Sequence, residues 1–98
     1  MKMPLRYNII NLLLKNLEGM TPKALHDILD PIYIGEKQCS IEAIDHHLMS
    51  MKGVGLVKIK DAVEDDNGNL DVTYVMTDYG ATRAEKYIPE YLVMSVQV

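Results

Sequence analysis

Residues 40–57 read SIEAIDHHLMSMKGVGLV and combine a helix signal, a turn and the start of a strand. Ser40 is a residue type that caps helix N-termini, because its hydroxyl accepts a hydrogen bond from a free backbone N–H. The apolar residues after it recur at helical spacing and are expected to face the core: Ile41, Ile44, Leu48 and Met51. Gly53-Val54-Gly55 then ends the helical period. A helix, a glycine turn and a strand are therefore predicted in direct succession.

A β-hairpin is predicted after this turn. The segment LVKIKDAVEDD (56–66) alternates between two faces, as a half-exposed strand does. One face is expected to hold Val57, Ile59 and Asp61, and the other Lys58, Lys60 and Ala62. Asn67-Gly68-Asn69 is a hairpin-turn signal, and LDVTYVMT (70–77) is the returning strand.

A final helix is predicted directly after the hairpin, in TDYGATRAEKYI (77–88). Thr77 or Asp78 is expected to be its N-cap. Gly80 lies in its first turn, and its missing side chain is predicted to leave room where the hairpin and this helix meet.

A further helix is predicted in MTPKALHDILDP (20–31). Thr21 is expected to cap it, with Pro22 at the first helical position. Asp30-Pro31 ends it, because the residue before a proline is disfavoured in the α region. A long connection, IYIGEKQC (32–39), then leads to the helix that Ser40 begins.

The first predicted helix lies in PLRYNIINLLLKNLEG (4–19), with Pro4 in its first turn and Gly19 as a C-terminal stop. Its apolar residues form two stripes, one of Leu5, Ile9, Leu12 and Leu13 and one of Ile10, Leu14 and Leu17. A helix that is apolar on two sides must be covered twice. Either the rest of the domain wraps around it, or the second stripe belongs to a dimer interface.

The predicted order is helix, helix, helix, strand, turn, strand, helix. We therefore predict one domain over residues 1–98, of the α+β class and mostly α, because the start and stop signals agree with one another. A three-helix bundle followed by a two-stranded β wing and a C-terminal helix is the winged-helix plan. Residues from about 77 to 98 form the C-terminal helix and tail.

The segment MKGVGLVKIKDAVEDDNGNLDVTYVMTDYGATRAEKY (51–87) resembles the helix-to-wing part of winged helix-turn-helix transcription regulators of the PadR and MarR kind. In those families a turn of the Leu-x-x-x-Gly-Leu-Val type precedes the wing, and LMSMKGVGLVKI (48–59) is similar to it. Their second wing strand ends in Tyr-x-Leu-Thr-x-x-Gly, which the run from Tyr74 to Gly80 resembles, and Ala84-Glu85-Lys86 follows. The resemblance implies a DNA-binding regulator that dimerises through its terminal helices.

Composition predicts a soluble, cytoplasmic protein. The single cysteine, Cys39, excludes an internal disulfide and fits a reducing compartment. The longest apolar runs, at 12–14 and 91–94, are too short to span a bilayer, and no signal-peptide pattern opens the chain. We predict no cofactor and no membrane partner.

Candidate DNA-binding residues lie on the third predicted helix and on the first strand. The outward arc of the helix is expected to hold Glu42, Ala43, His46, Met49 and Ser50, with His47 at its edge. Ser40, Ala43, His46 and Ser50 would lie nearest the bases, and Lys23, Lys58 and Lys60 would meet phosphates. The carboxylates of Glu64, Asp65 and Asp66 at the hairpin tip are expected to stay out of the minor groove, because they repel phosphates.

The alternative is a winged-helix module that docks a protein partner and does not bind DNA. The outward arc carries no Arg, Lys, Asn or Gln, which are the usual base-reading residues. The net charge is −4, which repels nucleic acid at long range. The acidic wing and the methionines would then form the contact surface.

Neither catalysis nor a metal site is predicted. The tip carboxylates lack a base partner, and the chain has no glycine-rich phosphate loop or nucleophile elbow. His46 and His47 are adjacent on a helix, so they point about 100° apart and do not chelate one ion. A site built by His26, Cys39 and a histidine of the third helix is the alternative.

A homodimer is predicted from the apolar residues at the two ends of the chain. The tail is too apolar to lie free in water, and it is expected to join the second stripe of the first helix. The interface would contain Ile10, Leu14, Leu17, Tyr87, Tyr91 and Leu92. In the alternative, the tail folds back on its own domain.

Overall fold

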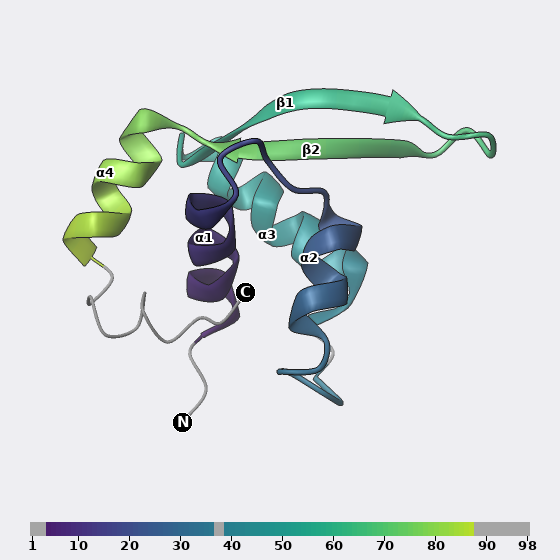
Figure 1. The fold of residues 1–98 in the computed structure, drawn as a ribbon, viewed down its shortest axis with the longest axis horizontal. Coiled ribbons are helices and arrows are strands. Elements are labelled where there is room, and N and C mark those ends of the chain that lie inside the picture. Colours follow the sequence, from purple (N-terminus) through teal and green to yellow (C-terminus); the bar gives the residue numbers. More distant parts are fainter. Residues whose placement is uncertain (1–3, 37–38, 88–98) are drawn as a thin grey trace.

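The computed structural model describes residues 4–36 and 39–87. Within these ranges the chain forms four helices and two strands, and Figure 1 shows their arrangement. In chain order they are α1 (Leu5–Lys15), α2 (Pro22–Leu29), α3 (Ile41–Gly53), β1 (Val57–Glu64), β2 (Leu70–Met76) and α4 (Asp78–Tyr87). The order is the predicted one, and the described chain is a small α+β domain with a two-stranded antiparallel sheet.

Side-chain caps begin three of the helices where the sequence predicts them. Thr21 Oγ1 and Ser40 Oγ each accept a hydrogen bond of 3.1 Å from the backbone N–H three residues further on. Thr77, rather than Asp78, caps α4, because the N–H of Gly80 donates to its Oγ1 at 2.8 Å. Each cap satisfies one N–H that has no partner within its own helix.

Helix α1 lies in the middle of the domain, between α4 on one side and α2 and α3 on the other (Figure 1). Leu12 and Leu13 have no exposed surface, and Ile10, from the second apolar stripe, is 7% exposed. Ile10 therefore packs in the core of its own chain, as a central helix requires. Leu14 is half-buried, and Leu17, beyond the end of α1, is 77% exposed.

The predicted inward stripe of α3 is correct at Ile44, Leu48 and Met51, each of which is fully buried. The prediction is wrong at Ile41, because its side chain is 42% exposed. As the first residue of α3, it lines a groove between this helix and the hairpin instead of the core.

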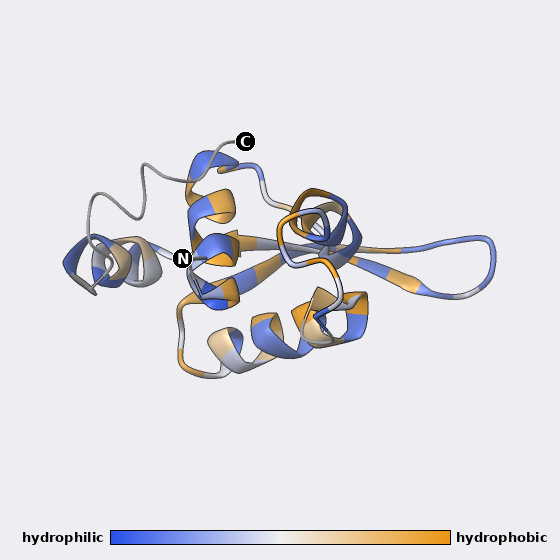
Figure 2. Cartoon of the chain, turned by 90° about the horizontal axis from the view of Figure 1, so that it is seen from below, coloured by the Kyte–Doolittle hydropathy of each residue, from blue (hydrophilic) through white to orange (hydrophobic). Residues whose placement is uncertain are grey.

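The hairpin has a buried end and a projecting end. Tyr74 anchors it in the core at 1% exposure, whereas every residue in 58–71 is exposed. The far end of the hairpin projects beyond the helices (Figures 1 and 2). The prediction of a half-exposed first strand is therefore wrong beyond its first residue, because the arm extends past the helices. The register also shifts between Ile59 and Asp61, where Lys60 is the additional residue of a bulge.

The connection between α1 and α2 runs along β2. Met20 and Tyr74 exchange two backbone hydrogen bonds, of 3.0 and 2.9 Å. Gly19 has a φ of +105°, and a Cβ on it would come within 2.6 Å of Thr73 Cγ2. Glycine is therefore required here for its backbone conformation and for the close approach to β2.

Part of the predicted dimer surface is not covered by the structure. Tyr91 and Leu92 lie outside the described residues, as does the side chain of Tyr87. Among the helices that are described, none is long and apolar enough to cross a membrane.

Candidate functional site

The outer side of α3 presents a short polar face. Glu42, His46, Met49 and Ser50 are exposed, as the helical angles predict, while Ala43 is half-buried. Ser40 is also exposed, and its hydroxyl oxygen is used to cap the helix. The side chains that can meet a ligand from this face are therefore one imidazole, one thioether, one carboxylate and two hydroxyl groups.

His47, at the edge of this face, contacts Arg6 of α1. Arg6 Nη2 lies 3.1 Å from His47 Nδ1. Because a guanidinium only donates, Nδ1 must accept, and the imidazole proton of the neutral ring is on Nε2. Burial lowers the pKa of His47 below its usual 6.5, and the positive charges of Arg6 and His46 lower this pKa further.

Arg6 is a candidate site residue that sequence reasoning missed. It is exposed, and it places a cation beside the outer face of α3. The contact joins residues 41 positions apart, so no spacing or motif in the sequence reveals it.

The three predicted phosphate-binding lysines do not form one cluster with this face. Lys60 Nζ donates to the backbone carbonyl of Glu18 at 2.9 Å, which turns the side chain toward the α1–α2 connection. Lys23 Nζ lies 3.5 Å from Asp27 Oδ2, one helical turn further along α2. Lys58 is exposed on β1.

A groove of about 640 Å³ lies between α2, α3 and the hairpin. Its lining includes apolar side chains from α3 and both strands: Ile41, Met49, Ile59, Leu70 and Val72. It also includes three carboxylates, of Glu42, Asp45 and Asp71, and one ammonium group, of Lys23. This side of α3 is therefore apolar and acidic, in contrast to the other edge of the helix, where Arg6 of α1 contacts His47.

Tyr74 fixes one of these carboxylates at the groove. Its hydroxyl lies 3.3 Å from Asp45 Oδ1 and the same distance from Met49 Sδ, so its single proton is shared between two acceptors. Burial raises the pKa of Tyr74 above 10.0, and the negative charge of Asp45 raises it further. Tyr74 therefore remains a neutral donor that ties β2 to α3.

The hairpin tip is an exposed acidic turn, as predicted. Asp65 Oδ1 accepts hydrogen bonds of 2.9 Å from the backbone N–H groups of Asn67 and Asn69. Gly68 has a φ of +82°, which the turn requires. Asp65 is therefore part of the turn structure, while Glu64 and Asp66 are exposed charges.

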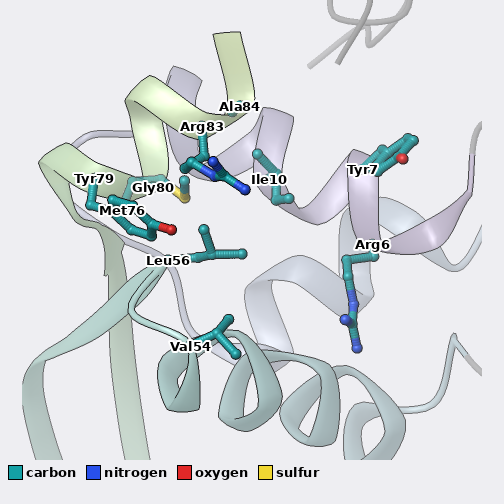
Figure 3. A pocket seen from close by; sticks show the side chains of 10 residues that line it. All are labelled: Arg6, Tyr7, Ile10, Val54, Leu56, Met76, Tyr79, Gly80, Arg83 and Ala84. Carbon is teal, nitrogen blue, oxygen red and sulfur yellow. The ribbon is translucent and has the colours of Figure 1, made fainter. Parts of the chain in front are cut away.

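A pocket of about 290 Å³ lies between α1, α4 and the turn after α3 (Figure 3). Its lining is mainly apolar, with Ile10 and Leu56 prominent, and it also includes Arg6 and Arg83. The guanidinium carbon of Arg83 lies 5.7 Å from the ring centre of Tyr79. Sequence reasoning found no ligand pocket, because its residues come from segments that are far apart in the chain.

A further polar group lies at the end of α2. One ligand atom each from His26, Asp30 and Cys39 lie within 4.8 Å of one another. Burial raises the pKa of the Cys39 thiol, and the negative charges of Asp30 and Glu36 raise it further. The sequence alternative joined His26 and Cys39 to a histidine of the third helix, but the structure places Asp30 in this group instead.

Comparison with models of known protein families gave no match, and no curated protein sequence matched the chain.

Proposed function

We propose that this protein is a winged-helix transcription regulator that binds double-stranded DNA and acts without catalysis. In this proposal α3 enters the major groove and the β1–β2 hairpin is the wing. The observation that carries it is the way α3 is held. One side of α3 is fully buried through Ile44, Leu48 and Met51, while the opposite side is free, and a projecting hairpin follows it directly.

The free side of α3 determines which contacts we expect with bases. His46 and Ser50 would donate or accept hydrogen bonds at base edges, and Ala43 would pack against a thymine methyl group. The N-terminus at Ser40 would lie near a phosphate, because the first backbone N–H groups of a helix attract anions.

Phosphate contacts would come from the flank of α3 that is free of carboxylates. Arg6 is exposed beside His47 on this flank, and we add it to the predicted set. Lys58 remains a candidate because it is exposed on the wing. Lys23 and Lys60 are weaker candidates. The ammonium group of Lys23 already pairs with Asp27, and that of Lys60 already donates to the Glu18 carbonyl.

A mobility-shift assay at low salt, with DNA selected from a random duplex pool, tests this proposal. We expect a discrete shift. We also expect His46→Ala and Ser50→Ala to weaken binding to the selected duplex by about 1–3 kcal/mol per lost base contact. Thr82→Ala is the matched control, because Thr82 is an exposed hydroxyl residue on α4. No shift, even with Glu64→Gln and Asp66→Asn at the tip, would exclude DNA binding.

The acidic groove supports a second candidate, a module that docks a protein segment. The occupant we expect is a peptide that combines Lys or Arg with apolar side chains, because it would match both the carboxylates and the apolar lining. Neutralising Glu42 and Asp71 separates the two candidates. Glu42→Gln with Asp71→Asn should strengthen DNA binding by removing repulsion, whereas it should weaken the binding of a cationic peptide.

A further inference from the structure

The polar group at the end of α2 brings together three side chains of different chemistry. His26 and Asp30 lie one helical turn apart, so that their side chains fall on the same side of α2 and its C-cap. Cys39 reaches them from the far end of the connection to α3. An imidazole nitrogen, a carboxylate oxygen and a thiol sulfur are each metal ligands, and their ligand atoms lie within 4.8 Å of one another.

The ring of His26 is held by a hydrogen bond to the connection between α2 and α3. His26 Nδ1 lies 2.8 Å from the backbone carbonyl oxygen of Cys39. Since a carbonyl only accepts, the proton of this hydrogen bond must be on Nδ1. In the neutral ring, Nε2 then has a free lone pair. A histidine whose other nitrogen donates to a backbone carbonyl is the usual arrangement at metal sites.

The distances are close to those that coordination requires. A tetrahedral ion with bonds of about 2.0–2.3 Å to N, O and S separates its ligand atoms by about 3.3–3.8 Å. The present separations, up to 4.8 Å, are longer than this, so side-chain rotations must bring the three ligand atoms, with Nε2 of His26 among them, together. Asp30 is exposed and can rotate freely, while Cys39 is 1% exposed and lies in the core. The exposed side of Asp30 also gives an ion a route of entry from solvent.

We propose that His26, Asp30 and Cys39 bind a divalent transition-metal ion of the zinc type, with water completing the coordination. On binding, the sulfur of Cys39 forms a bond to the ion and its thiol proton passes to solvent. The thiolate and carboxylate then carry two negative charges, which the divalent ion balances. The mixture of sulfur, nitrogen and oxygen ligands favours zinc over calcium or magnesium, which prefer oxygen alone.

The position of the site connects it to the start of α3. Cys39 directly precedes Ser40, whose hydroxyl caps that helix. His26 and Asp30 belong to the end of α2. A bound ion would therefore cross-link the two ends of the connection, and it would restrain the first turn of α3 relative to α2. This inference does not depend on the proposed function, because it concerns the ion and not DNA.

Titration of the reduced whole protein with Co²⁺ tests the proposal. A thiolate bound to Co²⁺ produces a ligand-to-metal charge-transfer band in the near ultraviolet, and Cys39 is the only cysteine that can produce it. We expect the band to appear with one equivalent of Co²⁺ and to disappear when Zn²⁺ displaces it. Zn²⁺ should also raise the midpoint temperature of unfolding.

Variants of the ligands make the test specific. Cys39→Ser should abolish the band, and His26→Gln and Asp30→Asn should each weaken Zn²⁺ binding at least about tenfold. His46→Gln is the control, because this exposed histidine lies outside the group. Asp30 is exposed, so its variant is expected to fold even if Cys39→Ser does not. Absence of the band in the parent protein, or unchanged Zn²⁺ affinity in Asp30→Asn and His26→Gln, would overturn the proposal.

Discussion

Gly80, in the first turn of α4, lies directly against the backbone carbonyl of Leu56 at the base of the hairpin. A Cβ on Gly80 would overlap the Leu56 oxygen and approach Met76 Cε to 2.9 Å. The predicted role of this glycine, to leave room where hairpin and helix meet, is confirmed. The contact holds α4 against the turn that follows α3, so it connects the C-terminal helix to the candidate DNA-binding element.

Gly80→Ala should therefore destabilise the domain. Alanine normally stabilises a helix by up to about 1 kcal/mol relative to glycine, but here the backbone must move to admit the methyl group. We expect a net loss of about 1–3 kcal/mol in the free energy of unfolding, measured by urea denaturation. Gly53→Ala, at the end of α3, is the matched control, because a Cβ there has no neighbour within 4 Å. Equal stability of the two variants would contradict the close packing at Gly80.

Thr77→Ala should destabilise the same junction through lost hydrogen bonds. The Thr77 hydroxyl accepts from the Gly80 N–H at 2.8 Å and donates to the Gly55 carbonyl at 2.6 Å. We expect a loss of about 1–2 kcal/mol in the free energy of unfolding, because an N-cap is removed and a carbonyl loses its donor. Thr77→Ser keeps the hydroxyl and should recover most of this loss. If serine were no better than alanine, the hydroxyl would not be responsible.

The lowered pKa of His47 predicts that acid weakens the fold. The folded-state pKa lies below the ordinary 6.5, so the unfolded chain takes up this proton first as the pH falls. Stability should be complete above about pH 6.5 and should decline until the pH has passed through the folded pKa. Urea denaturation of the parent protein and of His47→Gln between about pH 8 and pH 5 measures this decline. The free energy of unfolding should fall less in the variant than in the parent.

The cause of that shift has its own test. Arg6→Gln removes the positive charge beside His47 Nδ1, so the pKa of His47 should rise toward its ordinary value. An NMR titration of the His47 ring protons measures this directly. An unchanged pKa in Arg6→Gln would mean that burial and His46 cause the shift without Arg6.

The parts of the fold that local chemistry determines were predictable from the sequence. The caps at Thr21, Ser40 and Thr77 each act within one helical turn, and all three are found where predicted. The turn at Gly68 is local in the same sense. These features can be predicted because the residues that cause them are neighbours in the chain.

The candidate sites were less predictable, because they depend on residues that only tertiary packing brings together. Arg6 reaches His47 from another helix, and Asp30 meets Cys39 across a connection. The alternating pattern of β1 predicted a covered face, but Ile59 is 42% exposed at the groove, and Val63, further along the hairpin, is 57% exposed. A sequence pattern indicates which residues share a face and leaves open what that face meets.

The predicted homodimer is tested by sedimentation of the whole chain. Leu17, at 77% exposure, and the half-buried Leu14 are the described surface residues of the proposed interface. We expect a dimer, and we expect Leu17→Lys to weaken it because a charge would be buried in an apolar contact. Lys15→Gln, at the last residue of α1, is the control. An 11.1 kDa monomer at all concentrations would contradict the dimer.

The salt dependence of duplex DNA binding, measured by fluorescence anisotropy, tests the proposed function most directly. We expect the logarithm of the affinity to fall linearly with the logarithm of the salt concentration. Arg6→Gln should reduce the slope by about 0.9, the contribution of one phosphate contact, whereas Lys86→Gln on α4 should leave it unchanged. An affinity that changes neither with salt nor on Arg6→Gln would contradict the proposed function. The absence of binding to any duplex at low salt would also contradict it.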